Sequence, residues 1–322
     1  MFLKNLSRLS RTITLGLLLI LPALAPAETW HAQLGAQSRD KGRQVLAFLP
    51  NEMWIHTGDS ITWKMATDEP HTVSFLKAGQ VRPPFTVGCP GATPDGSFED
   101  GTGCVNSGVM ANDQSYSVMF PVAGSYKLTC LFHSNMTAVV HVLDLSQKLP
   151  HDQQFYDEAA RGRAFLLLAS GEEVNHAHHS HLGVTAGTGK VVATGGGTDT
   201  VSVMRFMFPA KVIHAGQTVE WTNDDPVTAH TITFGVEPQN LIPPSPNVSV
   251  DPDGARHATV ASTSDNVNSG FLKAAAQDQT GSPQTPLGGT RFRVTFPNPG
   301  VFNYICGLHD ELGMVGEVIV LP

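Results

Sequence analysis

The chain has 322 residues, of which 41% are hydrophobic and 15% charged, so it is long enough to bury a sizeable core. This composition argues against an intrinsically disordered chain. The 20 Lys and Arg residues are outnumbered by 28 Asp and Glu residues, and the resulting net charge of −8 argues against nucleic acid as a partner.

The first 27 residues are typical of a secretory signal peptide. Lys4, Arg8 and Arg11 precede an apolar run from Ile13 to Leu21, and Ala25-Pro26-Ala27 supplies a small-residue cleavage site. The apolar run is shorter than the roughly 20 residues that a membrane-spanning helix needs. Cleavage would leave 17 basic and 28 acidic residues, a net charge of −11 over 295 residues. We therefore expect a periplasmic or otherwise secreted protein with no membrane span after signal cleavage.

Residues 28–147 and 183–322 contain the same motifs in the same order, which predicts two copies of one domain. The segment at residues 54–63, for example, corresponds to the segment at residues 212–221. In both copies, short alternating segments rich in Val, Thr, Phe and Tyr are separated by Gly, Pro, Asn and Asp, which favours strands. The sequence therefore predicts an all-β protein of two tandem β-sandwiches.

A disulfide is expected in the first copy. The chain has four cysteines, and an even number in an oxidising compartment is typical of disulfide-bonded proteins. Cys89 and Cys104 enclose a polar, glycine-rich loop that lacks other internal support, so we predict that they are bridged. On the loop-entropy argument, such a bridge contributes about 3 kcal/mol to stability.

Between the two copies, residues 148–182 interrupt the strand pattern and predict a linker. One helix is expected there, because apolar residues at Phe155, Ala159, Ala160, Ala164, Phe165 and Leu168 follow helical spacing. From Gly171 through the glycines up to Gly197, the sequence predicts a loop. The tract His176–His181 contains four histidines, which either capture a divalent metal ion or simply belong to a solvated loop.

Each copy also contains the components of a metal site. A His on an early strand is followed near the end of the copy by Cys-x-x-His and then by a Met. Two imidazoles, a thiolate and a weak axial thioether are the ligands of a type 1 (blue) copper electron-transfer site. Zinc fits less well, because Met is a poor zinc ligand and the spacing matches no zinc ribbon. The candidate copper ligands are His71, Cys130, His133 and Met136 in the first copy, and His230, Cys306, His309 and Met314 in the second.

With these residues in place, both copies resemble the cupredoxins, the family of plastocyanin, amicyanin, pseudoazurin and azurin. The spacing from Cys130 to Met136 is similar to that of amicyanin, and the spacing from Cys306 to Met314 is similar to that of plastocyanin and pseudoazurin. The resemblance covers most of residues 45–143 and 203–322. It implies two Greek-key cupredoxin domains, each binding one type 1 copper ion for electron transport.

The resemblance also implies where electrons enter and leave. In cupredoxins the downstream His ligand reaches the surface, so His133 and His309 are the expected electron ports. Apolar residues near them would form a docking patch, and the acidic surface would steer a basic partner. We expect that partner to be a redox protein such as a cytochrome or a copper oxidoreductase. The residues expected in the patch are Leu131, Phe132, Leu308, Leu312 and Gly313.

Two alternative functions were weighed. A two-domain copper oxidase or a nitrite-reductase-like enzyme needs a second copper centre, connected through a His beside the ligand Cys. Here Cys130 follows Thr129 and precedes Leu131, and neither neighbour of Cys306 is a His. We therefore predict an electron carrier with no catalytic residues. The other alternative is a copper carrier or resistance protein that uses the tract His176–His181.

Overall fold

The computed structural model describes residues 26–83, 89, 91–177, 183–194, 197–279 and 287–322. All but the last two residues of the predicted signal peptide lie outside this part of the chain. Among the described residues, no helix combines the length and the apolar composition needed to cross a membrane.

In the part of the chain that the structure describes, strands come first and last, and one long helix lies between them. The first sandwich contains β1 (Thr29–Gln37), β2 (Arg43–Leu49), β3 (Glu52–His56), β4 (Ser60–Met65), β5 (Ser74–Phe75), β6 (Ser97–Phe98), β7 (Val105–Asn106), β8 (Ser115–Met119), β9 (Gly124–Thr129) and β10 (Thr137–Leu143). Helix α1 (Gln153–Ala177) follows.

The second sandwich contains β11 (Gly183–Thr194), β12 (Gly197–Val203), β13 (Ala210–His214), β14 (Thr218–Asp224), β15 (Thr233–Phe234), β16 (Ser249–Val250), β17 (Arg256–Thr259), β18 (Val267–Asn268), β19 (Arg291–Thr295), β20 (Gly300–Ile305) and β21 (Val315–Leu321). Two short 3₁₀ helices, η1 (Leu287–Gly289) and η2 (Asp310–Leu312), lie between these strands.

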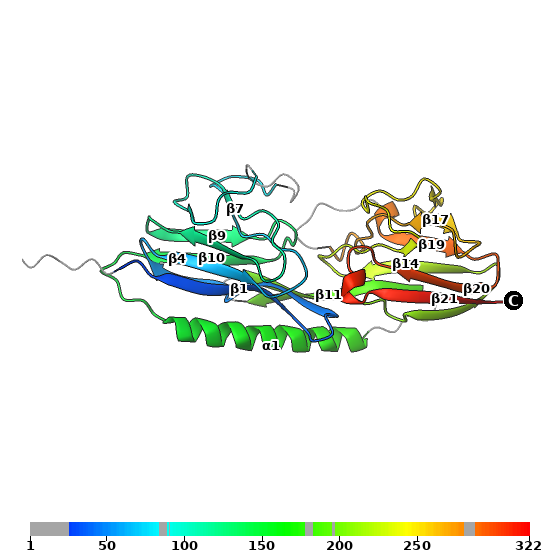
Figure 1. The fold of residues 1–322 in the computed structure, drawn as a ribbon, viewed down its shortest axis with the longest axis horizontal. Helices are drawn as coiled ribbons and strands as arrows, with labels where there is room; N and C mark the ends of the chain where they lie inside the picture. The colour runs from blue at the N-terminus through cyan, green and yellow to red at the C-terminus, as the bar shows by residue number, and fades with distance from the viewer. Residues whose placement is uncertain (1–25, 84–88, 90, 178–182, 195–196, 280–286) are drawn as a thin grey trace, which may run out of the picture.

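The described strands form three sheets. One sheet of the first sandwich has the order β3-β10-β9-β5-β7, and the matching sheet of the second has the order β13-β21-β20-β15-β18. Each faces one half of a shared sheet with the order β16-β17-β19-β14-β11-β12-β2-β1-β4-β8-β6. Figure 1 shows the two sandwiches end to end along the long axis of the molecule. The predicted fold class of two tandem β-sandwiches is confirmed.

The shared sheet joins the two sandwiches through equivalent strands. Strand β1 runs parallel to β4 and antiparallel to β2, and β11 runs parallel to β14 and antiparallel to β12. At the junction β2 pairs antiparallel with β12, with Val45 opposite Val201. The sandwiches therefore meet with approximate twofold symmetry, as two subunits of a dimer do.

The loop predicted from Gly171 to Gly197 is wrong for most of its length. Helix α1 continues to Ala177, and β11 begins at Gly183. The glycine-rich segment forms a strand because β12 and β14 on either side satisfy its backbone hydrogen-bonding groups. Tertiary pairing therefore overrides the low strand propensity of glycine.

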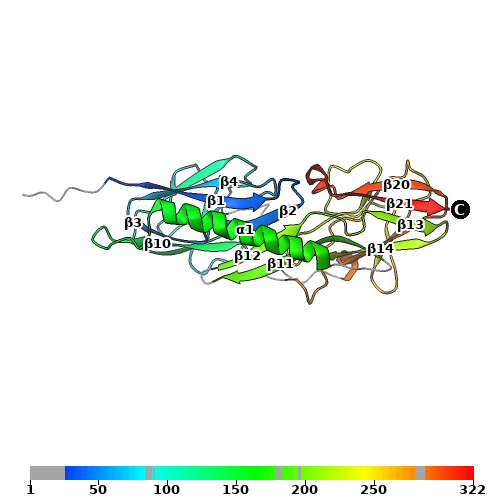
Figure 2. The ribbon, with the colours of Figure 1, turned by 90° about the horizontal axis from the view of Figure 1, so that it is seen from below.

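Helix α1 covers the shared sheet on the side of the first sandwich and reaches the junction, as Figure 2 shows. Its inward side chains include Tyr156, Ala160 and Leu167, which are buried against β1 and β2. The expected helix is present, but its predicted apolar face is partly wrong, because Phe155 and Phe165 are exposed. The Tyr156 hydroxyl sets the rotation of the helix, since it accepts a hydrogen bond from Trp54 N and donates one to Trp54 O.

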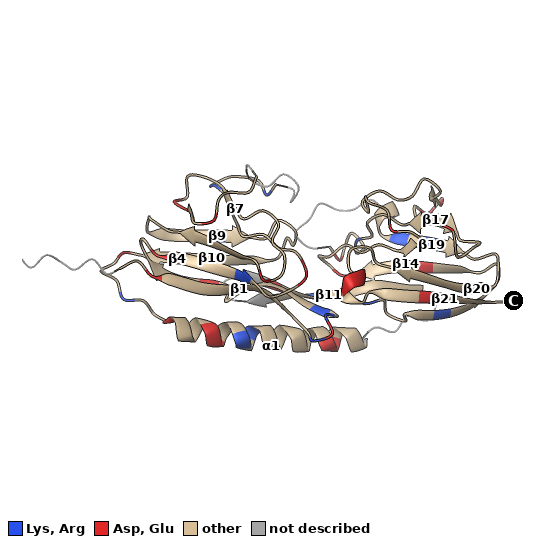
Figure 3. Cartoon of the chain, viewed as in Figure 1, with Lys and Arg blue, Asp and Glu red and all other residues tan. Residues whose placement is uncertain are grey.

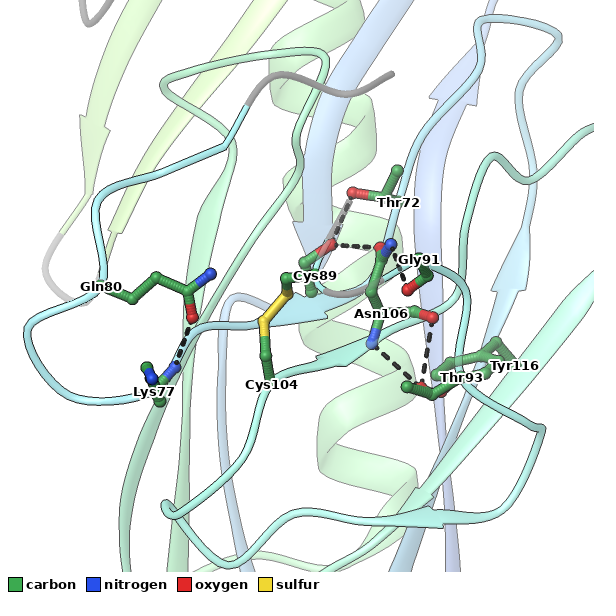
Figure 4. Close-up of a disulfide and its surroundings, with 10 residues drawn as sticks. Thr72, Lys77, Gln80, Cys89, Gly91, Thr93, Cys104, Asn106 and Tyr116 are labelled. Atoms are coloured by element: carbon green, nitrogen blue, oxygen red, sulfur yellow. Dashed lines mark hydrogen bonds between the residues drawn. A yellow bond between two sulfur atoms is a disulfide. The ribbon is translucent and has the colours of Figure 1, made fainter. Parts of the chain in front are cut away.

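Cys89 and Cys104 form a disulfide in the first sandwich. Figure 4 shows that the bridged loop also hydrogen-bonds to Asn106. The amide oxygen of Asn106 accepts a hydrogen bond from Ser74, whose hydroxyl lies 2.9 Å from that of Thr72. The disulfide loop is thereby connected to the strand end that follows the first candidate ligand, His71.

Candidate metal centres

In the first sandwich, three predicted ligands converge in the core. His71 lies between β4 and β5, Cys130 directly follows β9, and His133 lies in the turn after it. The two Nδ1 atoms are 3.1 Å apart, and each lies 3.8 Å from Cys130 Sγ. All three side chains are buried.

The second sandwich repeats this geometry. The Nδ1 atoms of His230 and His309 are 3.0 Å apart, and they lie 3.8 and 3.4 Å from Cys306 Sγ. These three side chains are also buried. Both groups of three are recognisable as potential metal-ion sites.

The methionines are held close to these groups through the backbone. Met136 N donates to His133 O, and Cys130 N donates to Met136 O. In the second sandwich, Met314 makes the same two hydrogen bonds with His309 and Cys306. Both methionines are fully buried in the same cores as the cysteines.

The thiol groups of both cysteines are prepared for metal binding. Burial by itself raises the pKa of a thiol, but the neighbouring imidazoles outweigh this and hold the pKa values of Cys130 and Cys306 well below the usual range. The backbone N–H groups of Thr72 and Thr231 also donate to the two sulfur atoms, at 3.4 and 3.3 Å. Thiolate is the form that binds a metal ion.

The donors fit copper. Separations of 3.0 to 3.8 Å between donor atoms are those expected when bonds of about 2 Å radiate from a single ion in a trigonal plane. One thiolate, two imidazoles and an axial thioether are the type 1 copper ligand set. Each sandwich therefore carries one His-Cys-His-Met type 1 copper site.

The threonine after the first His ligand of each site also has a structural role, which the ligand spacing alone does not predict. The hydroxyls of Thr72 and Thr231 accept hydrogen bonds, each 2.8 Å long, from the N–H groups of Leu131 and Gly307. Each hydroxyl thus ties the residue after the ligand Cys to the strand that carries the ligand His. The repeated motif His-Thr-x-(Ser/Thr)-Phe contained this signal.

A larger omission was Glu69, which brings the two sites together. Its Oε1 lies 3.1 Å from His133 Nε2, and its Oε2 lies 3.2 Å from His309 Nε2. The side chain comes from the first sandwich and is only 5% exposed. One carboxylate therefore contacts the downstream ligand of both copper sites.

This arrangement corrects the expected electron ports. His133 and His309 are each 3% exposed, so neither ring reaches the surface. The expected apolar patch is also incomplete, because Leu131 and Leu312 are buried, whereas Leu308 is 38% exposed. The resemblance to cupredoxins implied that the edge of the downstream His ring faces solvent. Here the corresponding edges of His133 and His309 point toward Glu69 at the junction of the two sandwiches.

The surroundings of Glu69 have opposing effects on its ionisation. Burial opposes its ionisation, but His309 and His133 outweigh burial and hold the pKa of Glu69 well below its usual range. With a metal ion held on Nδ1, the Nε2–H of each ligand would face this carboxylate. Carboxylates in such positions orient metal-binding imidazoles and raise their basicity.

The histidine tract lies mostly outside the described residues. His176, at the end of α1, contacts the carboxylate of Glu172 at 2.9 Å. Residues 178–181 are not among the residues that the structure describes, and the possible metal capture by this tract stays a prediction.

Comparison with known proteins gives a consistent picture. Residues 36–143 and 192–321 match the family of copper binding proteins described as the plastocyanin/azurin family. Among solved structures, a reduced amicyanin variant is 21% identical, with a TM-score of 0.25, over 38% of this chain and 87% of that chain. An oxidised amicyanin variant is also 21% identical, with a TM-score of 0.24, over 35% and 81% of the two chains. No curated protein matches the chain.

Proposed function

Because the chain belongs to the plastocyanin/azurin family of copper-binding proteins, we propose that it is an exported electron carrier with two cupredoxin domains, residues 28–147 and 183–322. The linker at residues 148–182 joins these domains. The observation that carries the proposal is the presence of two fully buried His-Cys-His clusters of matching geometry. The disulfide and the signal-like N-terminus support export.

In this proposal each domain holds its ion with four residues: His71, Cys130, His133 and Met136 in the first, and His230, Cys306, His309 and Met314 in the second. Copper, when bound, supplies one-electron redox chemistry. The buried strands and the hydroxyls of Thr72 and Thr231 hold the donors in place in both oxidation states. A site that moves little during a redox cycle transfers electrons rapidly.

We propose that the redox partner docks on the second domain. Leu308, two residues after Cys306, is exposed. The segment that packs beside Gly307 through Leu241 also has two exposed apolar residues, Val236 and Ile242. Acidic Glu237 and Glu311 accompany them, and this combination suits a basic protein such as a cytochrome or a copper oxidoreductase. Figure 3 colours the acidic residues of the chain red, among them those of η2 at the boundary with the first sandwich.

Electron transfer from a basic cytochrome should slow as salt increases. Raising the ionic strength from about 0.01 to about 0.15 M shortens the range of charge attraction and should lower the second-order rate constant. Stopped-flow absorbance measures this rate, and the Glu237→Gln variant should show a smaller salt effect. A rate that is indifferent to ionic strength would contradict docking by charge.

Replacing either ligand cysteine should abolish one blue copper centre and spare the other. We expect Cys130→Ser and Cys306→Ser each to bind a single blue copper ion, because Ser supplies no thiolate for the intense charge-transfer band. Copper analysis and visible absorption measure the result. The double variant Cys89→Ser with Cys104→Ser is the control and should keep both blue centres.

The same samples separate this function from its alternatives. Unchanged absorption in either single variant would contradict the ligand assignment. An additional type 2 copper signal in the EPR spectrum of the parent protein, together with substrate turnover, would instead indicate an oxidase or a reductase.

A further inference from the structure

The two copper sites are connected by one short chain of atoms. From Nδ1 of His133 the chain runs through the imidazole ring to Nε2, across 3.1 Å to Glu69, across 3.2 Å to Nε2 of His309, and through that ring to its Nδ1. Covalent bonds and these two contacts make up the whole path. Because electron tunnelling weakens steeply across empty space, a path of this kind couples two redox centres far better than a path with van der Waals gaps.

The three residues of this path are buried at the junction. Glu69, His133 and His309 are 5%, 3% and 3% exposed, so the partner of each downstream imidazole is this carboxylate rather than solvent or a docked protein. The contact with His133 has hydrogen-bond geometry, whereas the contact of Oε2 with His309 is a close approach of 3.2 Å. In a dry environment, contacts between charged and polar groups are stronger than in water.

Glu69 is held by the hairpin formed by β1 and β2. Gln37 Oε1 accepts a hydrogen bond from Asp68 N at 3.0 Å, and Glu69 N donates to the hydroxyl of Thr67 at 3.3 Å. The Thr67 hydroxyl in turn donates to Gln44 Oε1, on β2. The backbone at Glu69 is therefore tied to the strand that forms the junction.

Arg205 fixes the other end of the path. Its guanidinium donates to Asp40 O, in the β1–β2 turn, at 2.7 Å and to Leu312 O, in η2, at 2.6 Å. Leu312 lies in the ligand loop between His309 and Met314. The second ligand loop is thus clamped to the hairpin that carries the contacts of Glu69.

The charged groups beside the two sites are not the same. Arg82 donates to the carbonyl oxygen of Cys130 at 2.7 Å. Near Cys306 lie the acidic residues Glu237 and Asp310, together with the guanidinium of Arg205, which contacts the same ligand loop. Positive charge favours Cu(I) and negative charge favours Cu(II). Because the second site has these acidic residues beside it as well as an Arg, we expect the first site to have the higher reduction potential.

We propose that Glu69 is an internal bridge through which an electron passes from the copper site of the second domain to that of the first. This inference rests on the proposed electron-carrier function. One electron leaves Cu(I) in the second domain, which becomes Cu(II), and reduces Cu(II) in the first domain to Cu(I). No bond forms or breaks, and the imidazole N–H protons stay in place. A one-electron donor protein then re-reduces the second site, and a one-electron acceptor protein oxidises the first.

The test injects less than one electron per chain into fully oxidised, copper-loaded protein by pulse radiolysis. Rapid-freeze EPR then follows the two Cu(II) signals, which Cys130→Ser and Cys306→Ser identify individually. We expect the electron to redistribute toward the first domain at a rate that is independent of protein concentration. In Glu69→Gln one contact oxygen is replaced by an NH₂ group that cannot accept from imidazole, so this rate should fall roughly ten- to hundredfold.

The matched control is Asp113→Asn, which also removes one negative charge from the first sandwich. Asp113 is exposed and pairs with Lys64, away from the contacts of Glu69, so we expect the parent rate. Glu69→Asp keeps the charge but shortens the side chain, and it should be slow like Glu69→Gln. A spectroscopic readout is independent of the rate: NMR of the diamagnetic Cu(I) protein should show two slowly exchanging imidazole N–H signals, and both should move in Glu69→Gln.

Several outcomes would overturn the bridge. One is a Glu69→Gln rate equal to that of the parent, and another is the absence of any concentration-independent phase in the parent. The direction of electron transfer is tested separately, without a Glu69 variant. Redox titration of the parent protein should give two midpoint potentials, and the higher one should disappear in Cys130→Ser. If the lower one disappeared instead, the proposed direction would be wrong. If the parent lacked two blue copper ions, the proposed function itself would fail, whereas two blue ions without internal transfer would refute only the bridge.

Discussion

Gly187→Ala should empty the copper site of the second domain while the first stays loaded. Gly187 lies at the irregularity in β11 and has a φ of +133°, a conformation that favours glycine. A Cβ atom there would lie 2.2 Å from His230 Nε2 and 2.7 Å from Cδ2 of the same ring. Because His230 is fully buried, its ring has no free space in which to retreat.

Copper analysis of purified Gly187→Ala should therefore give one blue copper ion per chain instead of two. Gly216→Ala is the matched control, because Gly216 also belongs to the second domain and has a positive φ of +88°, but a Cβ atom there meets no other atom within 4 Å. It should lose some stability and keep both copper ions. Full copper loading of Gly187→Ala would show that the strand does not constrain His230.

Arg163→Met should lower the free energy of unfolding by about 3 to 5 kcal/mol. Arg163 Nε on α1 lies 2.6 Å from Asp199 Oδ2 on β12, and the Asp199 side chain is completely buried. Met retains most of the aliphatic packing but leaves a buried carboxylate without its partner. Denaturant unfolding of the copper-free protein measures the loss, and Arg161→Met, at an exposed position on the same helix, should change stability far less.

The destabilisation should depend on pH in a defined direction. Burial raises the pKa of Asp199 even beside Arg163, so the folded state holds the Asp199 proton more tightly than the unfolded state does. Removing the guanidinium raises this pKa further. As pH falls through the raised pKa, protonation favours the folded state and the cost of Arg163→Met should shrink. A cost that grows on acidification would contradict this account.

The ligand groups could be anticipated because the sequence repeats them. Cys130 and His133 lie close together in the chain, and a Met follows at a short interval, so local spacing already carries much of the geometry. Finding the same order around Cys306 made a chance pattern improbable. Three ligands of each site therefore lie within one short segment, and the second copy contains the same segment again.

The relation between the two domains could not be anticipated in this way. The pairing of β2 with β12 and the two contacts of Glu69 depend on segments that are far apart in the chain. Glycine in β11 suggested a loop, although Gly187 is needed for close approach to a buried ring. The spacing of apolar residues within one segment does not predict which distant segment it packs against. For the same reason, the predicted apolar face of α1 included residues that are exposed.

The twofold relation of the domains has a consequence for a carboxylate that lies at their junction. Two identical chains paired through β2 would bring two copies of Glu69 toward the same pair of histidines, placing two anions where one fits. In this chain the residue two positions before His230 is Thr228 instead. When both domains belong to one polypeptide, each can carry a different residue at equivalent positions. The two copper sites can then differ from each other, which is impossible in a symmetric dimer of identical chains.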